Sequence, residues 1–357
     1  MTILEESGNP AAPNPAVQPA QSAIVQLQTR KPARSLWGDA FYRLLHNRAA
    51  ILGAVIIVLN IIIAIFAPTF APKAFDDAIL ADNNAAPKWI TQIFPTMRPK
   101  SEGGYITVSE AYALGADKLG RDLLSRLIYG ARISLAVAVI GPSFSIIIGL
   151  TVGLIAGYTG GQVDNLLMRF VDVMYAFPTL LLIILLLAVF RTSFHDQEPG
   201  TLAYTLDQLD ASIGGLLFVF IGIGITAWMG MARLVRGQVL SVRELAYVEA
   251  ARAIGARSST IIIRHILPNI IGPLIVAETL AIPSYISYEA FLSFIGLGVR
   301  PPTPSWGSMI SEGAQAIQTY PNQTIFPALA LFLIMFAFNF LGDGLRDALD
   351  PTMRGVD

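Results

Sequence analysis

Residues 133–157 read ISLAVAVIGPSFSIIIGLTVGLIAG, a stretch without a charged side chain. At about 1.5 Å per residue, a helix of this length exceeds the about 30 Å hydrocarbon core of a bilayer. Five further runs are equally apolar, and the charged residues within all six are Asp172, Glu278 and Glu289. The runs predict an all-α membrane protein with six transmembrane helices. The other five are residues 49–67, 170–190, 213–232, 270–296 and 325–342.

The composition excludes several classes of protein. Of 357 residues, 54% are hydrophobic and 14% are charged, against roughly a quarter charged in soluble domains. A net charge of −1 leaves no basic field for nucleic acid. With no cysteine and three dispersed histidines, we expect no metal site. No Gly-x-x-x-x-Gly-Lys-Ser/Thr phosphate loop occurs, so we expect no cofactor in this chain.

The placement of Lys and Arg predicts the orientation, because short loops rich in these residues stay in the cytoplasm. With the N-terminus inside, the inside segments hold fourteen of them and the two short outside loops hold two. The sequence therefore predicts that both termini are cytoplasmic. No cleavable signal is expected, since the first apolar run starts some fifty residues in and continues as a full span.

The chain divides into five predicted parts. Residues 1–35 are expected to be a disordered cytoplasmic tail, and 36–67 an interfacial segment followed by the first transmembrane helix, with an ordinary juxtamembrane flank as the alternative for 36–48. Residues 68–132 are expected to be an extracytoplasmic loop. Its Leu119, Leu123, Leu127 and Ile128 predict an amphipathic helix, along the membrane edge or capping the bundle. Residues 133–342 form the predicted five-helix transmembrane core, including loop 241–268, and 343–357 a cytoplasmic tail.

Small residues and prolines predict how the helices pack. Lipid gives helices no hydrophobic reason to associate, so small residues allow the close contact that holds a bundle together. Prolines inside spans remove backbone hydrogen bonds and predict kinks at 142, 178, 273 and 283. The second span carries a small residue at every fourth position: Gly141, Ser145, Gly149, Gly153 and Gly157.

The loop between the fourth and fifth spans reads SVRELAYVEAARAIGARSSTIIIRHILPN over residues 241–269. It predicts a helix-turn-helix: a capping box of Ser241 and Glu244 opens the first helix, and Gly255 closes it. Ser258 is expected to cap the second helix and Pro268 to end it. The alanines of the first helix leave room for another protein surface, and Glu249 is spaced for an ion pair with Arg252. Docking of a partner and an ordinary helical hairpin both fit this pattern.

These residues resemble the coupling loop of ABC importer permeases. Glu249-Ala250-Ala251, then Gly255, then Leu267-Pro268 is similar to the "EAA" pattern of that family, with His265 where many members have isoleucine. His265 and Asn269 resemble the dipeptide/oligopeptide/nickel branch, and the chain looks most like its C-type permease subunit. Residues 119–135, 164–178 and 292–307 match the same branch, whereas about 70–115 is longer than usual there.

The resemblance implies a non-catalytic subunit that forms half of a translocation pathway. Two ATPase subunits carrying ATP and Mg would dock on the coupling loops of this chain and of a second permease, in a heterodimer within the membrane lipid. A solute-binding protein would deliver di- or oligopeptides from outside. The location implied is the cytoplasmic (inner) membrane of a bacterium or archaeon. The resemblance assigns ATPase coupling to Glu249, Ala250, Ala251, Gly255, His265, Leu267 and Pro268.

Three alternatives remain open from the sequence. The same machinery could carry nickel chelates, opines or another small solute, because the branch motifs do not name the cargo. A passive channel or scaffold is a second alternative, but it would not need a loop that docks a partner. A membrane-embedded hydrolase lacks a cysteine nucleophile and a His-Glu-x-x-His zinc site.

Charged residues inside spans are costly, so they are candidates for the pathway. Glu278 is expected to line it, with hydrogen bonds to peptide backbone from Tyr285 and Tyr288. Glu289 fits cavity lining and helix packing equally. Asp172 is expected to pair with Arg169. The proline-rich loop 301–307, with Trp306, is expected to be an external lid or a contact for the binding protein.

Overall fold

The computed structural model describes residues 36–194 and 198–350. Within these ranges every regular element is a helix. The predicted tail 1–35 and residues 351–357 of the predicted tail 343–357 lie outside the described residues, whereas residues 343–349 are not a tail but continue α16 to Leu349. Five helical segments are long and apolar enough to cross a membrane. They are α3 (Arg48–Ile65); α6 (Leu123–Phe144) with a π-turn (Ser145–Gly149) and α7 (Leu150–Thr159); α11 (Leu217–Arg243); α13 (Ser258–Ile261) with a π-turn (Ile262–Ile266) and α14 (Leu267–Phe294); and α16 (Asn322–Leu349).

The kink predicted at Pro178 is present, and it divides the predicted span 170–190 between two helices. The chain forms α8 (Gly161–Tyr175) and α9 (Thr179–Phe194), which meet at 83°. Pro178 explains the break, because it lacks an N–H group and disfavours helical geometry at Phe177. A count of six spans therefore holds only if this bent pair is one span.

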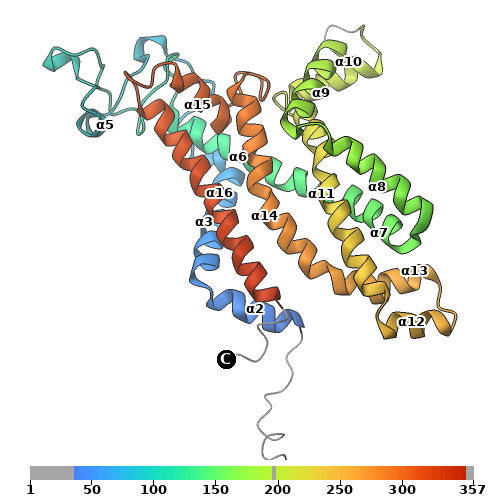
Figure 1. The fold of residues 1–357 in the computed structure, drawn as a ribbon. Helices are drawn as coiled ribbons and strands as arrows, with labels where there is room; N and C mark the ends of the chain where they lie inside the picture. Colours follow the sequence, from blue (N-terminus) through green and yellow to red (C-terminus); the bar gives the residue numbers. More distant parts are fainter. Residues whose placement is uncertain (1–35, 195–197, 351–357) are drawn as a thin grey trace, which may run out of the picture.

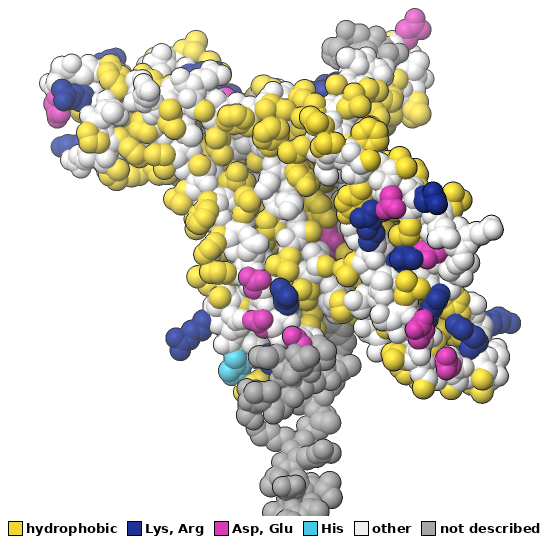
Figure 2. Space-filling view, in the orientation of Figure 1, with side chains coloured by type: hydrophobic (Ala, Val, Ile, Leu, Met, Phe, Trp, Pro, Cys, Tyr) yellow, Lys and Arg dark blue, Asp and Glu magenta, His cyan; other side chains and the backbone are white. Residues whose placement is uncertain are grey.

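The remaining elements lie at the two ends of the bundle (Figure 1). One end carries α2 (Leu36–His46) and α12 (Ala246–Ala253), next to α13. The opposite end carries α5 (Lys88–Ile93), α10 (Leu202–Ser212) and α15 (Trp306–Ala314). A helix is thus present where the interfacial segment was predicted. Figure 2 shows hydrophobic side chains over α3 and the upper part of α16, whereas Lys, Arg, Asp and Glu gather over α8, α12, α13 and the lower end of α16. The short α4 (Ala67–Phe70) follows α3.

No separate amphipathic helix forms over 119–128, so that prediction is wrong. Gly120 has a φ of +77°, which ends helical geometry there. Asp122 is the N-cap of α6, and its carboxylate accepts a hydrogen bond from the Ser125 N–H at 2.7 Å. Leu123 and the residues after it therefore belong to the second span itself.

A buried ion cluster joins the segment before α6 to α15. Asp117, Arg121 and Arg126 are 3%, 6% and 2% exposed. Arg126 donates to Asp117 and to Glu312 of α15, with the Glu312 contacts at 2.8 and 3.1 Å. Arg121 also binds both acids, at 2.6 Å to Asp117 and 2.9 Å to Glu312. The cluster fixes the outer lobe of residues 72–122 to the bundle.

Trp306 is neither an exposed interface aromatic nor available to a binding protein. It is 2% exposed at the first position of α15. Its indole Nε1 donates to the Leu127 carbonyl at 3.0 Å. A Cβ on Gly130 would lie 2.9 Å from the indole ring, so that glycine makes room for it. The loop packs α15 onto α6.

The structure confirms that the small residues of the second span serve close packing. A Cβ on Gly153 would lie 2.6 Å from both the Ala232 carbonyl oxygen and the Val235 Cβ. On Gly149 and Gly157 it would lie 2.6 and 2.8 Å from side-chain atoms of α11. The backbone of α7 therefore lies directly against α11 along this stripe.

Gly153→Leu is expected to lower the yield and the apparent Tm of purified protein, because its Cβ meets backbone that cannot move aside. Overpacking of this kind costs about 1–3 kcal/mol. Gly237→Leu is the matched control, since Gly237 lies in α11 with no atom within 4 Å of its Cβ position. Thermal unfolding in detergent checks this; equal Tm values for the two variants would contradict the packing role.

Candidate functional site

The end of the bundle that carries α12 and α13 contains the predicted helix-turn-helix. Gly255 has a φ of +79° and follows the cap residue Ile254, as predicted for the residue that closes the first helix. Val248 and Ala251 point inward and join a cluster with Val242 and other residues of α11, α13 and α14. This apolar cluster holds the helical pair on the bundle.

Three details of the predicted helix-turn-helix are wrong. Ser241 and Glu244 form no capping box, because α11 continues to Arg243 and α12 begins at Ala246 without a side-chain cap. Ser258 is the first residue of α13 and provides no cap. Pro268 does not end a helix. The π-turn Ile262–Ile266 precedes it, so the missing proline N–H is accommodated and the chain runs on into α14.

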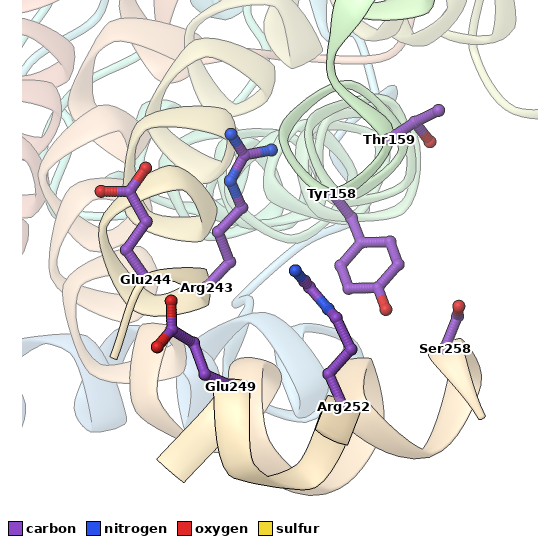
Figure 3. A pocket seen from close by; sticks show the side chains of 7 residues that line it. All are labelled: Tyr158, Thr159, Arg243, Glu244, Glu249, Arg252 and Ser258. Carbon is purple, nitrogen blue, oxygen red and sulfur yellow. The ribbon is translucent and has the colours of Figure 1, made fainter. Parts of the chain in front are cut away.

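A hollow of about 780 Å3 lies between α12 and the ends of α7 and α11 (Figure 3). Glu249 and Arg252 rise from α12 on the side facing Arg243 and Tyr158. Glu249 and Arg252 form no ion pair with each other in the described part of the chain, contrary to expectation. Both charges are therefore available to another group. The lining residues are Tyr158, Thr159, Arg243, Glu244, Glu249, Arg252 and Ser258.

The tip of this element is apolar and exposed. Ile254 is 86% exposed, the largest value among the exposed large hydrophobic residues described, and Ile263 is 62% exposed. Because large exposed apolar patches mark protein or membrane contacts, this tip is a candidate contact surface. Sequence reasoning missed Ile254, although an isoleucine directly before a turn glycine was a visible signal.

The predicted coupling residues divide between surface and interior. Glu249, Ala250, Gly255 and Pro268 are exposed, whereas Ala251 is 7% exposed and packs against the bundle. Ala251 is therefore not one of the alanines that leave room for another protein surface. His265 and Leu267 are half-buried, and the His265 ring lies 6.2 Å from the Tyr247 ring.

A second cavity, of about 250 Å3, lies where α8 and α9 break beside α11 and α14. Tyr285 and Tyr288 both line it, and neither Glu278 nor Glu289 does. No charged side chain lines this cavity. The complete lining is Tyr175, Thr179, Thr226, Ala227, Met229, Gly230, Ala281, Ser284, Tyr285 and Tyr288.

The intramembrane carboxylates have different surroundings. Glu278 accepts hydrogen bonds from Ser145 at 2.9 Å and from Tyr285 at 3.0 Å, so it lies directly behind the cavity wall. Glu289 is fully buried and accepts from Ser293 at 2.6 Å, which places it in helix packing. Asp172 pairs with Arg233 of α11 and not with Arg169.

A further ion pair beside the cavity was also missed. Asp164 of α8 binds Arg236 of α11 through both carboxylate oxygens. Arg233 lies over the Tyr175 ring, 4.1 Å from its centroid. These contacts hold α8 against α11 next to the break. Among the described residues, no group of three or more His, Cys, Asp or Glu side chains could hold a metal ion.

Comparison with known proteins gives matches along nearly the whole chain. The family profile for the binding-protein-dependent transport system inner membrane component matches residues 149–355, and that for the N-terminal transmembrane domain of oligopeptide transport permease C matches 35–87. The oligopeptide transport system permease protein OppC of Haemophilus influenzae is 40% identical, covering 90% of each chain. OppC of Bacillus subtilis is 38% identical over 91% of this chain and 92% of its own. The dipeptide transport system permease protein DppC of Bacillus subtilis is 36% identical, with coverage of 91% and 88%.

Proposed function

The chain belongs to the family of binding-protein-dependent transport system inner membrane components, and on that basis we propose that it is one of two permease subunits of an ATP-driven importer of di- or oligopeptides. The peptide cargo is supported by relatives named as oligopeptide and dipeptide permeases at 36–40% identity. The second permease, two ATPases that hold ATP and Mg, and a solute-binding protein complete the assembly.

The observation that carries the proposal is the exposed α12–α13 element with its apolar tip. Ile254 and the unpaired charges of Glu249 and Arg252 offer an apolar anchor with polar neighbours, the pattern of a docking surface. Ala250 leaves room for the ATPase, whereas Ala251, His265 and Leu267 act by holding the element on the bundle. Gly255 sets the reversal between α12 and α13, and Pro268 lies exposed beyond the π-turn.

The α12–α13 end faces the cytoplasm in this proposal, and both termini lie there. This orientation rests on the excess of Lys and Arg in the segments of that end. The opposite end, with α5, α10 and α15, then faces the binding protein. Since the relatives above are bacterial, the location is the bacterial cytoplasmic membrane.

The cavity beside Tyr285 and Tyr288 is the proposed half of the translocation pathway. Ligand pockets commonly measure about 300–1,000 Å3, so 250 Å3 on one chain suits a pathway that the second permease completes. Glu278 acts on this cavity through its hydrogen bond with Tyr285, and Glu289 supports helix packing.

Purification of the tagged protein from its native membrane in mild detergent tests the function. Co-elution of ATPase chains with a second permease, together with ATP hydrolysis, is the expected result. Recovery of the permease alone, even after gentle cross-linking, would refute the importer assignment and favour a channel or scaffold.

Ile254→Asp is expected to lower the amount of co-purified ATPase at least about tenfold, because burial of an isoleucine contributes about 1.5–3 kcal/mol. Ile93→Asp is the matched control, since Ile93 is 60% exposed in α5 at the other end of the bundle. Quantitative immunoblotting of the ATPase against the permease gives the ratio. Unchanged ATPase recovery with Ile254→Asp would exclude this tip from the docking surface.

A further inference from the structure

Three buried side chains form one hydrogen-bonded group at the wall of the cavity at the α8–α9 break. Ser145, Glu278 and Tyr285 are 1%, 5% and 6% exposed. Ser145 opens the π-turn between α6 and α7, and the other two lie two turns apart on α14. Of the three, Tyr285 lines the cavity. A Cβ on Gly141 would lie 2.7 Å from the Tyr285 ring, so the ring is held from the other side as well.

The direction of the hydrogen bonds within this group decides what Tyr285 can offer. A serine or tyrosine hydroxyl has one proton to donate and two lone pairs to accept with. Ser145 donates its proton to Glu278 Oε2, and Tyr285 donates its proton to Glu278 Oε1. No Lys, Arg or His of the described chain forms an ion pair with Glu278. In its ionised form Glu278 is an acceptor only, so it takes both hydroxyl protons and leaves Tyr285 with acceptor capacity alone.

A second hydroxyl on the cavity lining, that of Thr226, has also donated its proton within the protein. Thr226 donates its proton to the Ile223 carbonyl at 3.0 Å within its own helix. With no charged side chain on the lining, polar contact depends on such hydroxyls. The lining also carries the hydroxyls of Tyr175, Thr179, Ser284 and Tyr288, so it is at Tyr285 and Thr226, whose protons are already donated, that a solute with its own donors gains a hydrogen bond.

We propose that Glu278 is a positioning residue that holds Tyr285 as a hydrogen-bond acceptor, so that this half of the pathway recognises N–H groups of the solute. This rests on the proposed peptide transport. Peptides carry an N–H group at each amide and donors at a free amino terminus, whereas their side chains vary. Recognition of this kind accepts many peptides and disfavours those whose amides are methylated.

The test compares uptake of trialanine with uptake of its analogue methylated at the central amide nitrogen, which lacks one donor. The purified complex is reconstituted in proteoliposomes with saturating binding protein, and the uptake ratio of the two peptides is measured. Because the binding protein is the same in every sample, a change in the ratio originates in the permease. Wild type is expected to prefer trialanine by about fivefold, the value of one net hydrogen bond.

Tyr285→Phe removes the acceptor, and Glu278→Gln allows the amide to donate to Tyr285 and free its hydroxyl proton. Both variants are expected to reduce the preference to near unity while ATP hydrolysis continues. Ser143→Ala, on the exposed side of α6 where Ser143 donates to Val139, is the control. A preference that survives Tyr285→Phe, or a wild type without preference, overturns the inference. If Glu278→Gln does not assemble, Tyr285→Phe decides alone. Uptake of neither peptide by wild type would instead refute the proposed cargo.

Discussion

Replacement of Gly255 by valine is expected to separate this permease from its ATPases while leaving it folded in the membrane. Gly255 has a φ of +79°, and its N–H bonds the Arg252 carbonyl at 3.0 Å as α12 ends. A left-handed residue costs about 1–2 kcal/mol when it is not glycine, and a β-branched residue is a more severe outlier. A Cβ there would meet no atom within 4 Å, so the whole cost is backbone strain.

The strain is relieved when the turn changes shape, which moves Ile254 and α12 relative to α13. We expect the recovery of ATPase to fall by about tenfold, with permease yield and apparent Tm within error of wild type. The readout is the ATPase-to-permease ratio after affinity purification.

Two variants separate the turn geometry from nonspecific damage. Gly255→Asn keeps most of the ATPase, because asparagine tolerates left-handed geometry. Gly103→Val is the matched control: Gly103 has a φ of +77° and also has no atom within 4 Å of its Cβ position, but it lies in the outer lobe. Equal loss of ATPase in Gly103→Val and Gly255→Val would show that the Gly255 turn has no specific part in docking.

The turn could be predicted from sequence, whereas the helix boundaries before it could not. A glycine after an alanine-rich helix commonly ends that helix in left-handed geometry, so the role of Gly255 was predicted correctly. The Ser241 and Glu244 pattern failed because Val235, Val239 and Val242 continue the buried stripe of α11 past Ser241. Burial against α7 and α12 outweighs a local capping signal worth about 1 kcal/mol.

The composition of a span does not reveal its direction. Pro178 predicted a kink in residues 170–190, but nothing in this apolar run predicted a turn as large as 83°. Asp172 and Asp164 bind Arg233 and Arg236 of α11 and hold α8 against that helix. These pairs link residues more than sixty positions apart, so no local pattern could predict them.

The two carboxylates of the fifth span illustrate the same limit. In sequence, Glu278 and Glu289 are both isolated acids in one apolar run, and only Glu278 was favoured for the pathway. In the structure Glu278 binds Ser145 of another helix behind the cavity, whereas Glu289 binds Ser293 on its own helix. Their difference depends on which helix faces each residue, which follows from packing and not from α14 alone.

Arg126→Met is expected to destabilise the outer half of the protein more than any surface substitution. Arg126 is 2% exposed and bonds both Asp117 and Glu312, so methionine fills similar space but leaves the buried Asp117 and the partly exposed Glu312 with Arg121 alone. Breaking a buried ion pair from one side costs about 3–5 kcal/mol. We expect the apparent Tm to fall by roughly 10 °C and the lobe of residues 72–122 to become sensitive to protease.

A second change distinguishes uncompensated charge from lost packing. Glu312→Gln added to Arg126→Met removes one acid, so that Asp117 and Arg121 balance each other, and it should recover part of the lost Tm. Arg98→Met, at an exposed arginine of the same lobe, is the control and should leave Tm unchanged. If the double variant unfolds at or below the Tm of Arg126→Met, charge is not the cause. Removing an acid can restore stability only if unbalanced charge was the cause of its loss. The lobe would then be held by apolar contacts such as those of Ile90 and Phe326.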